Sequence, residues 1–221
     1  MTAALIVAAG RGSRLGADIP KQYLDLGGKS VLFRTIEAFL GLPDIARVQV
    51  VINPDDDTLF EEATKGLDDP RLAKPVPGGE TRARSVSNGL QALVGTAPQK
   101  VLIHDAARPF VTTRIIRDVI EALDTAEGAF SALEVVDALW RADEDHAATP
   151  VPRTNLWRAQ TPQGFHFDRI LDAHRASDGT AADDVAVARE AGIEVRLIPG
   201  DESNFKITTR HDLDRARALV T

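Results

Sequence analysis

Apolar residues follow two alternating patterns along the chain. Short apolar runs that end at glycine, proline or polar residues predict strands buried on both faces of a sheet. Longer segments with apolar residues every three or four positions predict amphipathic helices with one face on a core. The predicted strands are 3–9, 47–53, 101–104, 129–136 and 193–199, and the predicted helices are 30–40, 81–93, 112–123 and 208–220.

Polar residues stand where three of these helices would begin. Ser30 and Thr112 are expected N-caps, because a hydroxyl at that position accepts a hydrogen bond from the first helical turn. Thr209 and Asp212 have the spacing of a capping box.

Strands that alternate with helices predict an α/β fold, here a Rossmann-like, mostly parallel sheet with helices on both faces. Ligands of such sheets bind beyond the carboxyl ends of the strands. The loop at 10–21 and the turn "HDAARP" at 104–109 both follow predicted strands. We therefore expect the loop and the turn to face one crevice.

Residues 137–163 break the alternation of strands and helices. This stretch contains both tryptophans and three prolines, and it is too long for an ordinary connection. We interpret it as a hairpin-like arm that leaves the sheet and pairs with a second copy of the chain. A local cover over one sheet edge is the alternative.

The composition narrows the class of protein. A net charge of −7 over 221 residues argues against a nucleic-acid partner, which usually requires a basic excess. The absence of cysteine excludes disulfides, thiol catalysis and cysteine metal sites. The apolar run at the N-terminus is too short for a signal peptide or a membrane span, so we predict a cytoplasmic protein without a membrane partner.

The loop at 10–21 is rich in glycine, which suits a phosphate-binding turn. It is not a P-loop, because neither lysine nor a hydroxyl residue follows Gly16. It fits a dinucleotide fingerprint poorly, because Gly10 and Gly12 match but the third glycine is displaced.

The loop carries the cations Arg11, Arg14 and Lys21, and a nucleotidyltransferase loop explains Arg14 and Lys21 better than a dinucleotide fingerprint does. Backbone amides of a glycine turn can wrap a triphosphate, and cations can stabilise the charge that develops on the α-phosphate. The alternative is that Arg14 and Lys21 are solvated surface charges.

Five motifs in order resemble the 2-C-methyl-D-erythritol 4-phosphate cytidylyltransferase family. They are "AAGRGSRLGADIPKQYL", "PGGETRARSVSNGL", "HDAARPF", "RAQTPQGF" and "NFKIT". The resemblance implies a single nucleotidyltransferase domain over 1–221. It also implies transfer of CMP from CTP to 2-C-methyl-D-erythritol 4-phosphate with Mg²⁺, in isoprenoid precursor synthesis, by a homodimer joined through the arm.

The resemblance also implies roles for individual residues. Arg14 and Lys21 would be catalytic. CTP would be bound by Ala8, Ala9, Gly10, Gly12, Gly78, Gly79, Glu80, Ser85, Asp105 and Ala106. The acceptor would be positioned by Arg108, Arg153, Thr161 and Lys206, with Arg153 reaching across the dimer interface.

Some of these residues have simpler interpretations. Asp105 is a tentative Mg²⁺ ligand, but a structural ion pair with Arg108 is the alternative. Ser85 could be a helix cap. His104 is interpreted as structural, because a phosphate monoester is already largely ionised near neutral pH and needs no general base.

The chain departs from the family pattern at two positions. Ala138 and Ala182 stand where the family often has threonine, which removes two hydroxyls from the acceptor side. The acidic segments 55–57 and 142–146 are interpreted as solvated loops. Since no second enzyme domain follows the last helix, we expect one activity.

Three other functions are weighed against this one. A cytidylyltransferase for a pentitol phosphate, such as ribitol 5-phosphate, would share the loop and the fold. A nucleotide-binding protein without catalysis would not need the loop cations. A dinucleotide oxidoreductase would need an acidic ribose contact about 20 residues after the loop, and no suitable one is present.

Overall fold

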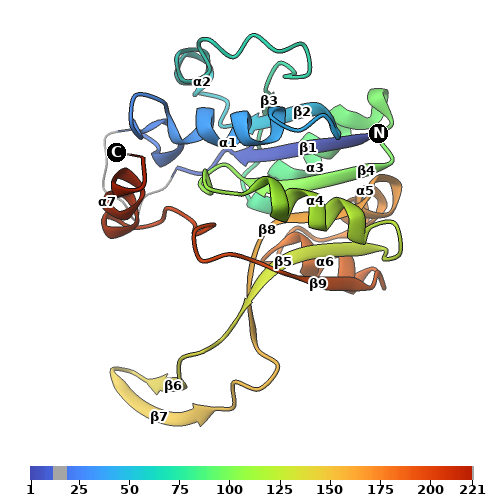
Figure 1. The fold of residues 1–221 in the computed structure, drawn as a ribbon. Helices are drawn as coiled ribbons and strands as arrows, with labels where there is room; N and C mark the ends of the chain where they lie inside the picture. The colour runs from blue at the N-terminus through green and yellow to red at the C-terminus, as the bar shows by residue number, and fades with distance from the viewer. Residues whose placement is uncertain (12–18, 221) are drawn as a thin grey trace.

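The computed structural model describes residues 1–11 and 19–220. Within these residues a seven-stranded sheet forms the centre, in the order β3-β2-β1-β4-β8-β5-β9 (Figure 1). The strands are β1 Thr2–Ala8, β2 Ile45–Ile52, β3 Val76–Pro77, β4 Lys100–Asp105, β5 Gly128–Glu134, β8 Trp157–His166 and β9 Val195–Pro199. Only β8 runs antiparallel to its neighbours in this sheet. The prediction of a mostly parallel sheet is therefore confirmed.

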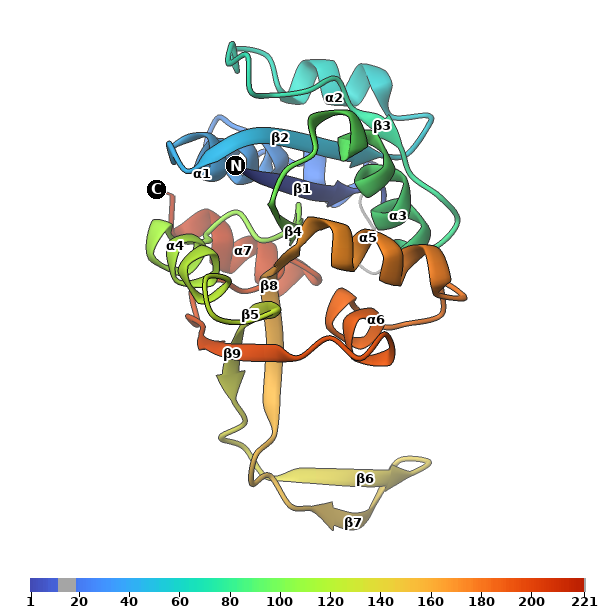
Figure 2. The same ribbon diagram turned by 90° about the vertical axis from the view of Figure 1, so that its right-hand side faces the viewer.

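Helices cover both faces of this sheet, as predicted (Figure 2). One face packs on α1 Val31–Leu40 and α4 Thr113–Ala122, and the other packs on α3 Arg82–Leu93, α5 Phe167–Ala176 and α6 Asp184–Glu190. The remaining helices are α2 Asp57–Ala63, α7 Arg210–Ala218 and the short 3-10 turns η2 Lys21–Tyr23 and η3 Val94–Thr96. Each face of the sheet therefore buries its own apolar layer.

The predicted helix caps are present. The Ser30 hydroxyl accepts the Phe33 N–H, and the Thr112 hydroxyl accepts the Ile115 N–H. Thr209 and Asp212 form the complete capping box at the start of α7. These local polar signals place the helix starts to within a residue or two.

The predicted arm is a hairpin that leaves the sheet. Strands β6 Leu139–Asp143 and β7 His146–Val151 pair only with each other and project away from the helices and the sheet (Figures 1 and 2). The acidic segment 142–146 is exposed, as predicted. Trp140 and Trp157 are 57% and 43% exposed in the single chain.

The predicted end of the arm at 163 is wrong. Residues Gln160–Gln163 lie inside β8, between β4 and β5. Gln160, Thr161 and Gln163 are buried although they are polar, because their side chains are hydrogen-bonded within the chain. The stretch therefore lacks the apolar run that would have marked a buried strand.

In the described part of the chain, no helix has the length and apolar character needed to cross a membrane.

Candidate active site

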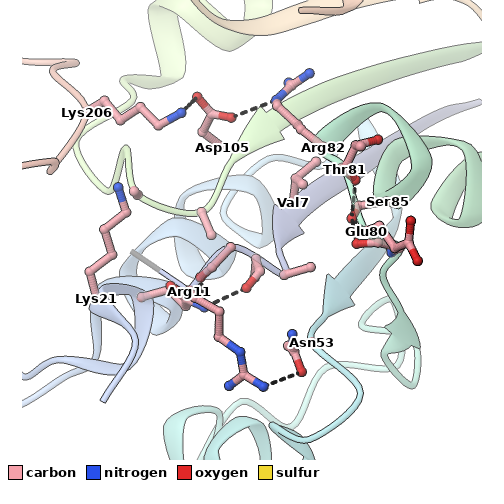
Figure 3. Close-up of a pocket in the computed structure, with 17 residues that line it drawn as sticks. Val7, Arg11, Lys21, Asn53, Glu80, Thr81, Arg82, Ser85, Asp105 and Lys206 are labelled. Carbon is pink, nitrogen blue, oxygen red and sulfur yellow. Dashed lines mark hydrogen bonds and ion pairs between the residues drawn. The ribbon is translucent and has the colours of Figure 1, made fainter. Parts of the chain in front are cut away.

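A cavity of about 440 Å³ opens at the carboxyl ends of β1, β2 and β4 (Figure 3). The start of the loop after β1 and the turn after β4 both line it, so the expectation that they face one crevice is confirmed. The lining residues are Val7, Ala8, Ala9, Gly10, Arg11, Lys21, Gln22, Asn53, Gly79, Glu80, Thr81, Arg82, Ser85, Asp105, Ala106, Ala107 and Lys206.

The two ends of the glycine loop are held together by Gln22, which the sequence analysis did not single out. Its buried side-chain amide donates to the carbonyl oxygens of Ala8, at 2.6 Å, and Gly10, at 3.1 Å. Gly12 and Arg14 lie outside the described residues. Their predicted roles stay predictions.

Arg11 is exposed, and its side chain is bound to the turn after β2. Its guanidinium donates to Asn53 at 2.8 Å, Asp55 at 2.8 Å and Asp56 at 3.1 Å (Figure 3 shows the bond to Asn53). Asp56 is 1% exposed, so the interpretation of 55–57 as a solvated loop is wrong at this residue. Asp56 can be buried because the Arg11 guanidinium pairs with its carboxylate. Tyr23 lies on the other side of Asp56, and burial and the negative charge of Asp56 raise the pKa of the Tyr23 hydroxyl.

Lys21 lines the cavity on the side opposite Ser85 (Figure 3). Its Nζ donates to the carbonyl oxygen of Ile207 at 2.7 Å. This bond connects η2 to the segment before α7, where Lys206 also lines the cavity. The structure therefore brings together two predicted cations that are far apart in the sequence.

The turn before α3 forms the opposite wall. The Ser85 hydroxyl accepts the Gly79 N–H at 3.1 Å and donates to the Thr81 carbonyl at 3.0 Å. Thr81 is the N-cap of α3. Ser85 therefore fixes the shape of the turn and also lines the cavity.

Gly78 supports this wall from behind and does not line the cavity. A Cβ added to Gly78 would lie 2.5 Å from Ala9 Cβ and 2.8 Å from Ser85 Oγ. A glycine is therefore needed for the close packing of the two walls.

Asp105 is surrounded by three cations from different segments. Its carboxylate lies 3.0 Å from Lys206 Nζ, 3.4 Å from Arg82 Nε and 3.5 Å from Arg108 Nε. Burial alone would raise the pKa of Asp105, but the charges of Lys206, Arg82 and Arg108 outweigh burial and hold the pKa well below its usual range. The structural ion pair with Arg108 is therefore present. Arg82 was missed as a site residue, although it lies within the quoted "PGGETRARS" motif.

His104 and Thr161 lie behind Asp105. Thr161 Oγ1 accepts the Asp105 N–H at 3.1 Å and lies 3.0 Å from His104 Nδ1, while His104 Nε2 lies 3.1 Å from the Arg108 carbonyl oxygen. Burial lowers the pKa of His104 from 6.5 to about 4, so the imidazole is neutral near pH 7. His104 lines neither this cavity nor the smaller one that adjoins it, which agrees with the structural role predicted for it.

A second cavity of about 170 Å³ adjoins the first. The two cavities share Arg82, Asp105 and Lys206, which therefore lie at their boundary. The other lining residues of the second cavity are Arg108, Ala159, Gln160, Thr161, Gln163, Ala182 and Asp183. Three of the four residues predicted to position the acceptor, Arg108, Thr161 and Lys206, thus line one small cavity.

Arg153 is the fourth of these residues, and a single chain does not bring it to either cavity. It is exposed and follows β7 in the arm. Ala138 is also exposed in the arm, whereas Ala182 lines the second cavity. Of the two alanines, only Ala182 therefore contributes to the lining of this cavity in the single chain.

The described residues contain no group of three or more histidine or acidic side chains that could hold a metal ion by themselves. Asp105 supplies one carboxylate at the cavity boundary. Mg²⁺ usually keeps several waters and takes many of its ligands from substrate phosphates. One carboxylate therefore fits a metal ion that a bound triphosphate mainly holds.

Comparisons with known proteins agree with this geometry. Residues 2–221 match the family model described as "IspD: 2-C-methyl-D-erythritol 4-phosphate cytidylyltransferase". The chain is 48% identical over 219 residues to the 2-C-methyl-D-erythritol 4-phosphate cytidylyltransferase of Cereibacter sphaeroides, covering 99% of this chain and 96% of that protein. It is 50% identical over 219 residues to the bifunctional enzyme IspD/IspF of Paramagnetospirillum magneticum, covering 99% of this chain and 56% of that protein. The chain thus spans about half the length of the bifunctional relatives.

Solved structures give the same result. A crystal structure of 4-diphosphocytidyl-2C-methyl-D-erythritol synthase superposes with a TM-score of 0.85 at 32% identity, covering 100% of this chain and 99% of the other. The 2-C-methyl-D-erythritol 4-phosphate cytidylyltransferase of Thermus thermophilus superposes with a TM-score of 0.79 at 33% identity, with the same coverage of the two chains.

Proposed function

This chain belongs to the 2-C-methyl-D-erythritol 4-phosphate cytidylyltransferase family, and we propose that it transfers CMP from CTP to 2-C-methyl-D-erythritol 4-phosphate in isoprenoid precursor synthesis. The observation that carries the proposal is the pair of adjoining cavities that share Arg82, Asp105 and Lys206. A phosphate oxygen of the acceptor attacks the α-phosphorus of CTP and forms a new P–O bond. The bond from the α-phosphorus to the bridging oxygen breaks, and pyrophosphate leaves with the bonding electrons. The other product is 4-diphosphocytidyl-2-C-methyl-D-erythritol.

The larger cavity suits the nucleotide. Small residues at the end of β1 allow backbone amides to approach phosphates closely, and the Ser85 turn provides polar groups for the edge of cytosine. Lys21 lies on the opposite side, where its ammonium would stabilise the negative charge that develops during transfer. Arg14 is proposed to share this role.

The smaller cavity suits a phosphorylated acceptor. Lys206 and Arg108 supply positive charge at its boundary and wall. The acceptor phosphate is already largely ionised near neutral pH, so the attack needs no general base. The buried, neutral His104 is consistent with such a mechanism, because it holds Thr161 and touches neither cavity.

We include Mg²⁺ in the proposal, held mainly by the triphosphate, with Asp105 as the protein ligand. When bound, the ion would neutralise part of the phosphate charge. The cytoplasmic location and the absence of a nucleic-acid partner stay predictions from the sequence.

We also propose a homodimer joined through the arm. The exposed Trp140 in the arm and Trp157 at the start of β8, where the chain returns from the arm, give this region an apolar surface of the kind that protein partners cover. In such a dimer Arg153 of one protomer would reach the smaller cavity of its partner. This arrangement explains why Arg153 lies away from both cavities in a single chain.

The first test is release of pyrophosphate from CTP and Mg²⁺ in the presence and absence of 2-C-methyl-D-erythritol 4-phosphate. We expect release only with the acceptor, and a loss of at least about 1,000-fold in Lys21→Ala. Faster turnover of ribitol 5-phosphate would keep the chemistry and replace the proposed acceptor. No release with either acceptor would leave a nucleotide-binding protein without catalysis.

A further inference from the structure

Asp184 is a fully buried carboxylate that touches neither cavity. It lies at the first position of α6, where its Oδ2 is 2.7 Å from Arg82 Nη2 and its Oδ1 is 3.1 Å from His174 Nε2. Burial alone would raise the pKa of Asp184, but the charge of Arg82 and the hydrogen bond from His174 outweigh it and lower the pKa. Asp184 is therefore a buried anion with two defined partners.

Arg82 connects this buried anion to the active site. Its Nη2 pairs with Asp184, while its Nε pairs with Asp105 at the boundary between the cavities (Figure 3 shows the bond to Asp105). Arg82 lines both cavities. One guanidinium thus joins the carboxyl end of β4 to the start of α6.

The backbone at Asp184 is also held firmly. Gln163 Oε1, on β8, accepts the N–H groups of Asp184 at 3.0 Å and Val185 at 3.1 Å. The Asp184 carboxylate is therefore presented to Arg82 from a backbone that the central sheet fixes in place.

A buried ion pair is a costly way to stabilise a fold, since apolar residues of similar volume often do as well. A pair of this kind is better suited to hold one geometry. Arg82 has a planar fork of donors, so two carboxylates on different sides fix its orientation. Without Asp184, the guanidinium would be free to rotate toward Asp105 and to disturb the contact of Asp105 with Lys206.

We propose that Asp184 is a positioning residue for nucleotidyl transfer, acting through Arg82 on Asp105. The inference rests on the proposed function, because it assigns Asp184 a part in that reaction. Asp184 orients the charged groups at the point where the two substrates meet and does not itself contact a substrate.

The competing explanation is that Asp184 only stabilises α6 together with His174. A double-mutant cycle on the full chain separates the two explanations. Steady-state kinetics with CTP and 2-C-methyl-D-erythritol 4-phosphate are measured for the native chain, Asp184→Asn, Arg82→Lys and the double variant. Glu190→Gln, an exposed change on the same helix, is the matched control, and thermal melting reports the folded fraction.

We expect Asp184→Asn to lower kcat on the order of 100-fold, because misplacement of groups at a reacting centre by about 1 Å has that effect. The KM for CTP should change little, since Ser85 and the glycine wall are untouched. In the Arg82→Lys background the same change should have less than about a twofold further effect. Glu190→Gln should behave as the native chain.

A native kcat in folded Asp184→Asn would overturn the inference. So would an equally large fall in kcat when Asp184→Asn is added to Arg82→Lys. If Asp184→Asn does not fold, Asp184→Glu replaces it, because glutamate keeps the buried charge but shifts the carboxylate by one methylene away from its place against Arg82. A low kcat with an unchanged KM for CTP then supports the inference, and native kcat overturns it. No turnover by the native chain would overturn the proposed function and this inference together, whereas native turnover with an unaffected variant overturns this inference alone.

Discussion

Lys206 Nζ and Asp105 Oδ2 lie 3.0 Å apart and join the segment before α7 to the carboxyl end of β4. Both residues line both cavities. The ion pair therefore holds the Lys206 ammonium at the place where the acceptor phosphate is proposed to bind.

Lys206→Ala should weaken use of the acceptor and leave the fold intact. The Lys206 side chain is 38% exposed, so its removal leaves little unpaired charge beyond Asp105, which keeps Arg82 and Arg108. We expect kcat/KM for the acceptor to fall about 100-fold, since a hydrogen bond to a charged phosphate is worth about 1.5–3 kcal/mol. Steady-state kinetics with each substrate varied in turn measure this. A higher KM for CTP with unchanged acceptor kinetics would contradict the role given to Lys206.

The His104 imidazole should make the fold sensitive to mild acid. Its folded pKa is depressed from 6.5 to about 4, so the unfolded chain binds the proton more tightly. The stabilisation is complete above pH 6.5 and is lost as the pH falls from 6.5 toward 4. The loss should reach roughly 3 kcal/mol.

Urea denaturation across this pH range, for the native chain and His104→Gln, isolates the contribution of His104. Other acidic groups titrate in both proteins, so only the difference between them reports the imidazole. Parallel curves for the two proteins between pH 6.5 and pH 4 would show that His104 is not held neutral.

Gly78→Ala should damage the nucleotide cavity, because the added Cβ would clash with Ala9 and Ser85 on the two walls. Overpacking of this kind costs about 1–3 kcal/mol of folding stability. Relief of the clash would displace Ala9 and Ser85, which line the cavity, so binding of CTP should also weaken, on the order of 10-fold. Gly95→Ala is the control, because its added Cβ meets nothing within 4 Å. Calorimetric titration with CTP measures both variants. If Gly78→Ala binds CTP with native affinity, the cytosine of CTP does not lie against this wall.

Arg153 provides a direct test of the proposed dimer. Arg153→Ala and Lys21→Ala are each expected to be nearly inactive alone. If Arg153 acts across the interface, mixed dimers contain one site with both native residues, and mixing should restore up to about a quarter of the native activity. If Arg153 acts within its own chain, no mixed dimer has an intact site and mixing restores nothing. Light scattering on the native chain checks the dimer independently.

Local sequence determined the secondary structure well where one physical signal dominates. The apolar runs of β1, β2 and β4 predicted buried strands, and the hydroxyls of Ser30, Thr112 and Thr209 predicted helix starts that the structure contains. The prediction that His104 is structural came from the chemistry of an ionised phosphate, whereas its burial is seen only in the structure. β8 was not recognised as a strand, because three of its buried residues, Gln160, Thr161 and Gln163, are polar and depend on partners distant in the sequence.

The sequence by itself determined the α/β alternation, the glycine loop and the motifs that indicate the family, because these depend on residues close together in the chain. Only the tertiary structure decided which charges meet. The sequence predicted Asp56 as a solvated acid, yet it lies against Arg11. The sequence analysis assigned no role to Asp184, yet Asp184 pairs with Arg82. The pairing of such groups depends on which strand and helix ends meet in space. Burial makes the fold depend on each of these pairings, because a buried charge without its partner is strongly destabilising.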